Sequence, residues 1–120
     1  MSTILLVDDD CFVLRFCTCL LESLEGVNLL EASNAIEALE CAGGHGGTID
    51  LLLADICMRG GVTGVELAST LAASRPSLKV LLMSGSYPED DWLQAQWRFI
   101  PKPFPPRQLL ATVEQMLATA

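Results

Sequence analysis

Five polar residues of the sequence could act together on a phosphoryl group or a metal ion, and each follows a short apolar run. They are Asp8, Asp9, Asp55, Ser84 and Lys102. The run at residues 49–54, which ends on Asp55, is short and continuous enough to predict a strand buried on both faces. In open parallel sheets, ligands bind at the carboxyl ends of the strands. We therefore predict that Asp55 accepts a phosphoryl group and that the other four residues serve it.

The three carboxylates should converge, because adjacent parallel strands end side by side. At ~4 Å and an effective dielectric constant near 20, each pair of carboxylates repels by roughly 4 kcal/mol, so a cation must offset the repulsion. Ligands that offer only oxygen favour Mg²⁺ over zinc or copper. The alternative is that Asp8, Asp9 and Asp10 only cap the following helix and complement its dipole, although a cap needs a single acid.

Lys102 and Ser84 would complete such a site. Lys102 would place a positive charge over the same edge of the sheet, and Ser84 would offer a hydroxyl group. Together they could bind two oxygens of a phosphoryl group on Asp55 while the metal binds a third. Alone, a Lys before Pro or a Ser before Gly is an ordinary turn residue. Separate strand ends bring these groups to one edge of the sheet, and this convergence indicates phosphoryl-group chemistry.

The elements that must position these residues alternate along the chain. Apolar runs predict strands at residues 3–7, 27–31, 49–55, 78–83 and 97–100, the last one weakly marked. The first helix should end at Gly26, and its apolar residues recur at Val13, Phe16, Cys17, Leu20, Leu21 and Leu24. Strand and helix alternate five times with no internal repeat and no linker. This order predicts a parallel sheet covered on both faces by helices.

Capping signals mark the start of two further helices. Asn34 with Glu37, and Thr63 with Glu66, each combine an N-cap residue with an acid three positions later. The second of these helices stops before Pro76 and carries Val65, Ala68, Leu71 and Ala72 on one face.

Two more helices are expected in the C-terminal third. Residues 86–89 (Ser-Tyr-Pro-Glu) resemble a helix start, but the segment from Tyr87 to Gln96 is short and poorly patterned. The last helix should begin at Pro105-Pro106, and its apolar stripe is Leu109, Leu110, Val113, Met116 and Leu117.

Length and composition bound the class of protein. A chain of 120 residues predicts one domain spanning 1–120, and a hydrophobic content of 51% argues against disorder. The net charge of −8 offers no basic patch for direct nucleic-acid binding. No apolar run reaches the ~20 residues that cross a bilayer, so no membrane insertion is expected. The first three residues do not resemble a secretory signal. We expect a soluble, cytoplasmic protein.

The five cysteines form no CxxC pair, and their number is odd. Cys11, Cys17 and Cys41 stand among apolar residues in helical patterns, where cysteine behaves as a small hydrophobe. Free cysteines predict a reducing compartment. Zinc binding has little support, because the only histidine, His45, lies in a Gly-rich loop that we expect to be solvated.

Four short motifs follow the predicted strands: Val7-Asp8-Asp9-Asp10, Asp55-Ile56-Cys57-Met58, Ser84-Gly85 and Lys102-Pro103-Phe104. With them, the chain resembles a two-component response-regulator receiver domain over essentially its whole length. The resemblance implies a flavodoxin-like, doubly wound sheet with strand order 2-1-3-4-5. It also implies a cis bond between Lys102 and Pro103, against a base rate of ~5–6% for X-Pro bonds.

The same resemblance implies a function. Asp55 would be phosphorylated by a histidine kinase or a phosphotransfer histidine. The domain would catalyse only its own phosphoryl transfer and dephosphorylation, and so would be a signalling domain. Mg²⁺ would be held by Asp9, Asp55 and the backbone carbonyl of Cys57, with Asp8 acting through water. Ser84 and Phe99 would form the switch that reports phosphorylation, and the alternative is that Phe99 is simply a core residue of the last strand.

The chain departs from the family pattern after Asp55. Arg59 stands where the family usually has Pro, and Gly60-Gly61 makes the loop one residue longer than its commonest form. The longer loop resembles receivers attached to hybrid sensor kinases. The chain is then either a stand-alone regulator or a receiver cut from such a kinase, whose own kinase domain would be a partner. The segment from Tyr87 to Gln96 is short for the family, which favours a small or irregular helix.

Two other functions suit an α/β domain of this size. A pseudo-receiver that docks partners without phosphorylation would not need five convergent polar groups. A flavodoxin-like cofactor binder needs a phosphate loop rich in Gly, Ser or Thr after the first strand. This chain has three aspartates there, which would repel phosphate unless a metal is present. Mg²⁺-dependent phosphoryl uptake from a small donor distinguishes the three functions.

Overall fold

The computed structural model describes residues 1–85 and 97–118. Within them, the elements follow one another in the order β1 (Ser2–Val7), α1 (Cys11–Leu21), β2 (Val27–Ala32), α2 (Ala35–Gly44), β3 (Leu51–Asp55), α3 (Gly64–Ser74), β4 (Lys79–Ser84), β5 (Arg98–Pro101) and α4 (Pro106–Ala118). The helix start expected at 86–89 and the short segment from Tyr87 to Gln96 lie outside the described residues.

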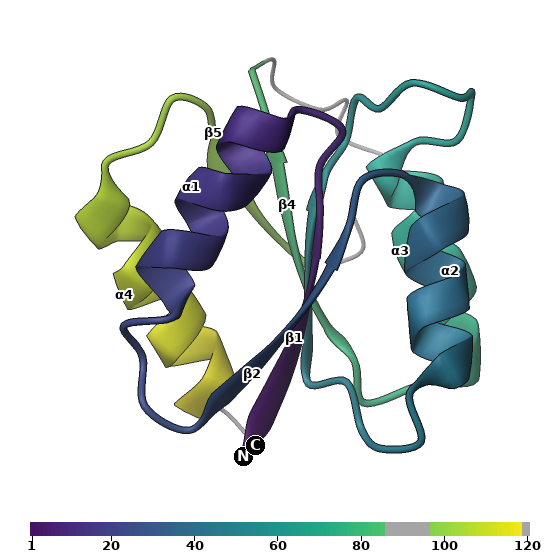
Figure 1. The fold of residues 1–120 in the computed structure, drawn as a ribbon, viewed down its shortest axis with the longest axis horizontal. Helices are drawn as coiled ribbons and strands as arrows, with labels where there is room; N and C mark the ends of the chain where they lie inside the picture. Colours follow the sequence, from purple (N-terminus) through teal and green to yellow (C-terminus); the bar gives the residue numbers. More distant parts are fainter. Residues whose placement is uncertain (86–96, 119–120) are drawn as a thin grey trace.

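The strands form one parallel sheet in the order β2-β1-β3-β4-β5, which confirms the flavodoxin-like topology (Figure 1). Helices α1 and α4 cover one face of the sheet, and α2 and α3 cover the other. The chain reverses its direction of winding between β1 and β3, because β2 lies on one side of β1 and all later strands lie on the other. In such sheets the carboxyl ends at the reversal form a crevice for ligands.

The central strands are buried on both faces, as their continuous apolar runs predict. Successive side chains point to opposite faces of a strand. In β1, Ile4 and Leu6 pack in the cluster beneath α1 and α4, whereas Leu5 and Val7 pack in the cluster beneath α2 and α3. β1 is thus packed on both faces, which fixes the position of the residue that follows it.

Only one of the three consecutive aspartates caps helix α1. The Asp10 carboxylate accepts hydrogen bonds from the backbone N–H groups of Phe12 and Val13, at 2.9 and 3.4 Å. The simple capping interpretation therefore holds for Asp10 and leaves Asp8 and Asp9 for another role.

The helix starts predicted from capping signals are confirmed. Thr63 and Glu66 form a reciprocal capping box at the start of α3. Asn34 caps α2 by accepting a hydrogen bond from the backbone N–H of Glu37 at 2.8 Å. The Glu37 carboxylate bonds Ser33 instead of the backbone of Asn34, and these bonds lower the pKa of Glu37.

Two helix faces differ from the expected ones. On α1, Cys17 is buried but Phe16 is 45% exposed, because adjacent residues of a helix point about 100° apart. On α3, the buried stripe includes Leu67, which the predicted face omitted, while Val65 is only partly buried. The apolar spacing in α3 allowed either face, and packing against the sheet selects the one that carries Leu67.

The cysteines are free in the described structure. Burial raises the pKa of Cys17 to about 11, with the charge of Asp8 adding to the effect. Cys41 is half-buried, but Cys11 is exposed, so its expected role as a small hydrophobe is wrong: it is the first residue of α1 and precedes the buried stripe. His45 follows α2 directly and is half-buried, where a solvated loop residue was expected.

Candidate functional site

Four of the strands end at one edge of the sheet and bring the candidate residues together. Asp55 is the last residue of β3, Ser84 is the last residue of β4, and Asp8 directly follows β1. The backbone N–H of Lys102, just after β5, donates a hydrogen bond to the carbonyl oxygen of Ser84 at 2.8 Å. The peptide bond between Lys102 and Pro103 is cis, as the resemblance implied. The chain therefore delivers these groups to one place, as the sequence predicts.

The three carboxylates converge. Asp8, Asp9 and Asp55 each offer an oxygen, and these oxygens lie within 4.8 Å of one another. Asp8 is fully buried and Asp55 is 6% exposed. One oxygen of Asp8 accepts a hydrogen bond from the backbone N–H of Asp10 at 2.9 Å, which fixes its orientation.

Lys102 is a half-buried cation between Asp8 and Asp55. Its Nζ lies 2.8 Å from Oδ2 of Asp8 and 3.5 Å from Oδ1 of Asp55. Burial by itself lowers the pKa of Lys102, but the hydrogen bond and charge of Asp8, together with the charge of Asp55, outweigh it and raise the pKa. Lys102 therefore remains charged at neutral pH.

Asp55 is more easily protonated than an ordinary aspartate, because its pKa is raised. Burial raises its pKa to about 6, and the negative charge of Asp8 adds to the rise. Lys102 and the backbone N–H of Cys57 act in the opposite direction. At pH 7 the carboxylate form still predominates, so an oxygen of Asp55 is available as a nucleophile.

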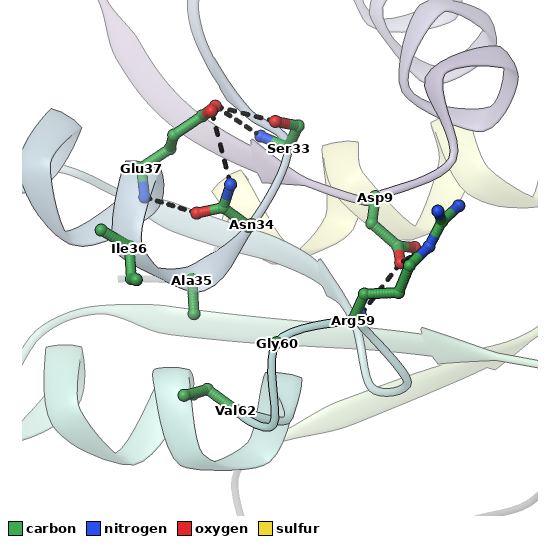
Figure 2. Close-up of a pocket in the computed structure, with 9 residues that line it drawn as sticks. All are labelled: Asp9, Ser33, Asn34, Ala35, Ile36, Glu37, Arg59, Gly60 and Val62. Atoms are coloured by element: carbon green, nitrogen blue, oxygen red, sulfur yellow. Dashed lines mark hydrogen bonds and ion pairs between the residues drawn. The ribbon is translucent and has the colours of Figure 1, made fainter.

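Arg59 is a second cation, and it lies at the mouth of the site. Its backbone N–H and its side-chain Nε both donate to Oδ2 of Asp9, at 3.0 and 3.2 Å (Figure 2). With Lys102, the cluster then holds two cations against three carboxylates. One negative charge remains, and all the donor atoms of the cluster are oxygens. This donor set fits a hard divalent ion such as Mg²⁺.

Ser84 and Cys57 lie beside each other at the edge of the cluster. Ser84 is almost fully buried, and its Oγ is 4.0 Å from Sγ of Cys57. Phe99 lies on β5 opposite Leu82 of β4, half-buried against the cluster beneath α2 and α3. This is where a core residue of β5 would lie, and a switch role for Phe99 stays a prediction.

Gly64 lies directly against the end of β3, and the sequence reasoning missed this contact. A Cβ atom on Gly64 would lie 2.2 Å from the carbonyl oxygen of Asp55. The Gly64 N–H donates to the carbonyl oxygen of Ile56 at 2.9 Å, so α3 begins in direct contact with the end of β3. The available signal was a glycine directly after the cap residue Thr63, within a predicted helix, where glycine is disfavoured.

A five-stranded parallel sheet with three acids and a lysine at its carboxyl edge defines a class of signalling domain. The chain belongs to the response regulator receiver domain family, whose family model matches residues 4–114. Domains of this family serve two-component phosphorelay signalling, so the chain is a signalling module of the receiver type.

Individual relatives include hybrid kinases. The chain is 35% identical over 121 residues to Sensor kinase CckA of Brucella abortus (strain 2308). This match covers 97% of the present chain but only 12% of the length of the sensor kinase. A crystal structure of the receiver domain from hybrid histidine kinase CckA matches with a TM-score of 0.82 and 32% identity, covering 97% of this chain and 99% of that one.

A metal-bound relative has the same fold. Response regulator protein TrrA from Thermotoga maritima, solved in complex with Mg²⁺ and BeF, matches with a TM-score of 0.83 and 28% identity. The match covers 97% of this chain and 99% of that one. Within the described part of this chain, no helix is both long enough and apolar enough to cross a membrane.

Proposed function

We propose that this chain is a phosphorelay receiver, folded as one domain over residues 1–120, that accepts a phosphoryl group on Asp55 from a histidine kinase or a phosphotransfer histidine. The observation that carries the proposal is Lys102, whose Nζ lies within 3.5 Å of both Asp55 and Asp8. A docking module would have no use for a half-buried lysine shared between two buried acids.

The transfer is an in-line displacement at phosphorus. A carboxylate oxygen of Asp55 forms a P–O bond while the P–N bond of the phosphohistidine breaks, and the imidazole keeps the electron pair of that bond. Lys102 then binds one oxygen of the transferred group, and the hydroxyl of Ser84 binds another. Burial of Asp55 strengthens both interactions, because they act where water is scarce.

Mg²⁺ would be held by Asp9, Asp55 and the backbone carbonyl of Cys57, with Asp8 acting through water. When bound, the ion would supply positive charge that screens the attacking carboxylate from the anionic donor. The residual negative charge of the acid cluster supports this assignment, as does the Mg²⁺ complex of the related TrrA structure.

The donor is a histidine kinase or a phosphotransfer protein. Similarity to a sensor kinase favours a donor on a hybrid kinase, which could be the chain of which this receiver forms part. The cytoplasm supplies such kinase domains and keeps the five cysteines reduced.

The experiment uses a small phosphodonor in place of the kinase. Acetyl phosphate with Mg²⁺ should add one phosphoryl group to the protein, as measured by intact mass, and EDTA should abolish the uptake. Asp10→Asn serves as the matched control for Asp55→Asn, since Asp10 caps α1 and does not belong to the acid cluster. Absence of uptake from acetyl phosphate and from a panel of phosphorylated histidine kinases would identify a pseudo-receiver instead.

A further inference from the structure

Arg59 pairs with an acid that the proposed function assigns to the metal. Both N–H donors, the backbone N–H and the side-chain Nε, meet the same oxygen of Asp9. The pair lies at one side of a cavity of about 470 Å³ between the loop before α2 and the loop after β3. Across that cavity, the Glu37 carboxylate bonds Ser33 and Asn34 instead (Figure 2). Arg59 is thus directed to Asp9.

The two cations of the site are held very differently. Lys102 is 21% exposed and its partner Asp8 is fully buried, whereas the Arg59 side chain is 89% exposed. Leaving Asp8 would strand a buried charge without a partner, which is costly. Leaving Asp9 would return the guanidinium to water, and the Asp9 carboxylate, whose side chain is 20% exposed, would then be paired by the incoming ion. Of the two cations, Arg59 is therefore the one that can leave its acid.

The loop that carries Arg59 is shaped to make this contact. Gly60 and Gly61 both have positive φ, 100° and 82°, a conformation that side chains with a Cβ rarely adopt. They turn the chain directly after Arg59, between the end of β3 and the cap of α3. The backbone N–H bond to Asp9 holds the loop in place, so the loop does not depend on the bond of the guanidinium.

We propose that Arg59 is an internal competitor of Mg²⁺ for Asp9, and that it raises the Mg²⁺ concentration at which the receiver is loaded. The inference rests on the proposed function, since it requires that Asp9 bind the ion. In the metal-free protein the guanidinium screens the carboxylates from one another. When Mg²⁺ arrives, the exposed side chain gives up its bond to Asp9 and moves into solvent.

The size of the effect follows from the exposure of the guanidinium, since the Arg59 side chain is 89% exposed and that of Asp9 is 20% exposed. Exposed ion pairs contribute little, so their loss changes an equilibrium constant by at most about fivefold. We expect the Arg59→Gln variant to bind Mg²⁺ about two- to fivefold more tightly than the wild type at low salt. Salt near 0.3 M should shrink the difference, since it screens exposed charges.

The test is calorimetric titration of MgCl₂ into the phosphate-free protein, without any phosphodonor. Arg59→Lys keeps the charge and should remain near the wild type. Arg15→Gln, a matched loss of one positive charge on α1, reports the general effect of net charge and should change the affinity less than Arg59→Gln. Asp9→Asn is included to test the site itself.

The outcomes separate the inference from the function beneath it. If the wild type binds Mg²⁺, Asp9→Asn weakens binding, and Arg59→Gln has unchanged or weaker affinity, the competition is disproved and the metal site stands. Weaker binding in Arg59→Gln would mean that Arg59 positions Asp9 for the ion. If the wild type binds no Mg²⁺, or if Asp9→Asn has no effect, the assigned metal site fails and the competition fails with it.

Discussion

The Nζ of Lys102 lies 2.8 Å from Oδ2 of Asp8, although the two residues are 94 positions apart in the chain. The contact joins the loop after β5 to the loop after β1, across the sheet from edge to interior. Since Asp8 is fully buried, its charge depends on this one lysine and on the N–H of Asp10. The same lysine also reaches Asp55 at 3.5 Å, so stability and the proposed chemistry share one side chain.

Replacing Lys102 with Met should therefore destabilise the metal-free protein. Removal of one partner from a buried ion pair costs up to ~3–5 kcal/mol, and the partial exposure of Lys102 lowers the expectation to about 2–4 kcal/mol. Urea denaturation at pH 7.5 measures the change. The double variant Lys102→Met/Asp8→Asn should recover at least half of the loss, because it no longer buries an unpaired charge. Equal instability of the single and double variants would contradict the assigned pairing.

Asp55→Asn should stabilise the metal-free protein at pH 8. The folded-state pKa of Asp55 is raised to about 6, above the ~3.9 of an unfolded Asp. Ionised Asp55 thus disfavours folding, and the cost develops as the pH rises from about 4 to 6 and is complete above 6. Asn avoids this cost, so the free energy of unfolding of the variant should exceed that of the wild type by about 1–3 kcal/mol, after allowance for partial solvation of Asp55. Thermal unfolding in EDTA at pH 8 and pH 4 measures it.

At pH 4 the wild-type side chain is already protonated in the folded state, and the advantage of Asn should nearly vanish. The comparison within one pH cancels the titration of the other acids. A variant that is less stable than the wild type at pH 8 would show that the buried carboxylate is better compensated than its raised pKa indicates.

Gly64→Ala should disturb the end of β3. The added methyl group would lie 2.2 Å from the Asp55 carbonyl oxygen, so either α3 or the Asp55 backbone must shift. Overpacking of this kind costs about 1–3 kcal/mol. Gly43→Ala is a matched control, because a methyl group there would meet nothing within 4 Å. Gly64→Ala should also slow phosphoryl uptake, and normal stability with a normal uptake rate would disprove the positioning role.

Phosphorylation should be read out by Ser84 and Phe99. A phosphoryl group offers new acceptor oxygens, and the Ser84 hydroxyl should move toward them. That movement would leave space beside β4, which the half-buried ring of Phe99 can fill. NMR of the free and beryllofluoride-bound protein measures the ring shifts and contacts of Phe99. If they are identical in the two states, Phe99 is a core residue only and the switch lies elsewhere.

The central strands were predictable from simple periodicity, and the acid cluster was predictable from the parallel topology that these strands imply. A short apolar run that ends on an acid gave β3 and Asp55, and the parallel topology then required Asp8 and Lys102 to meet at the same edge. Helix starts followed from local capping chemistry, as at Thr63 and Glu66. These features are determined by residues close in sequence or by the topology alone.

Other features depend on contacts that no local pattern encodes. The bond from Arg59 to Asp9 needs the turn that Gly60 and Gly61 make, whereas sequence reasoning established only that Arg59 replaces the usual Pro in a lengthened loop. The role of Gly64 comes from the close approach of α3 to β3, which is a packing result. Likewise, Phe16 fits the helical spacing of α1, and only the position of the helix on the sheet leaves it exposed.

The most direct test of the account is the location of the phosphoryl group. After incubation with acetyl phosphate and Mg²⁺, borohydride reduction converts an aspartyl phosphate to homoserine, and peptide mass spectrometry then identifies the residue. The account predicts a single homoserine at position 55, stable labelling in acid, rapid loss in base, and no labelling of Asp55→Asn. Homoserine at another position, or equal phosphoryl uptake by Asp55→Asn, would contradict it.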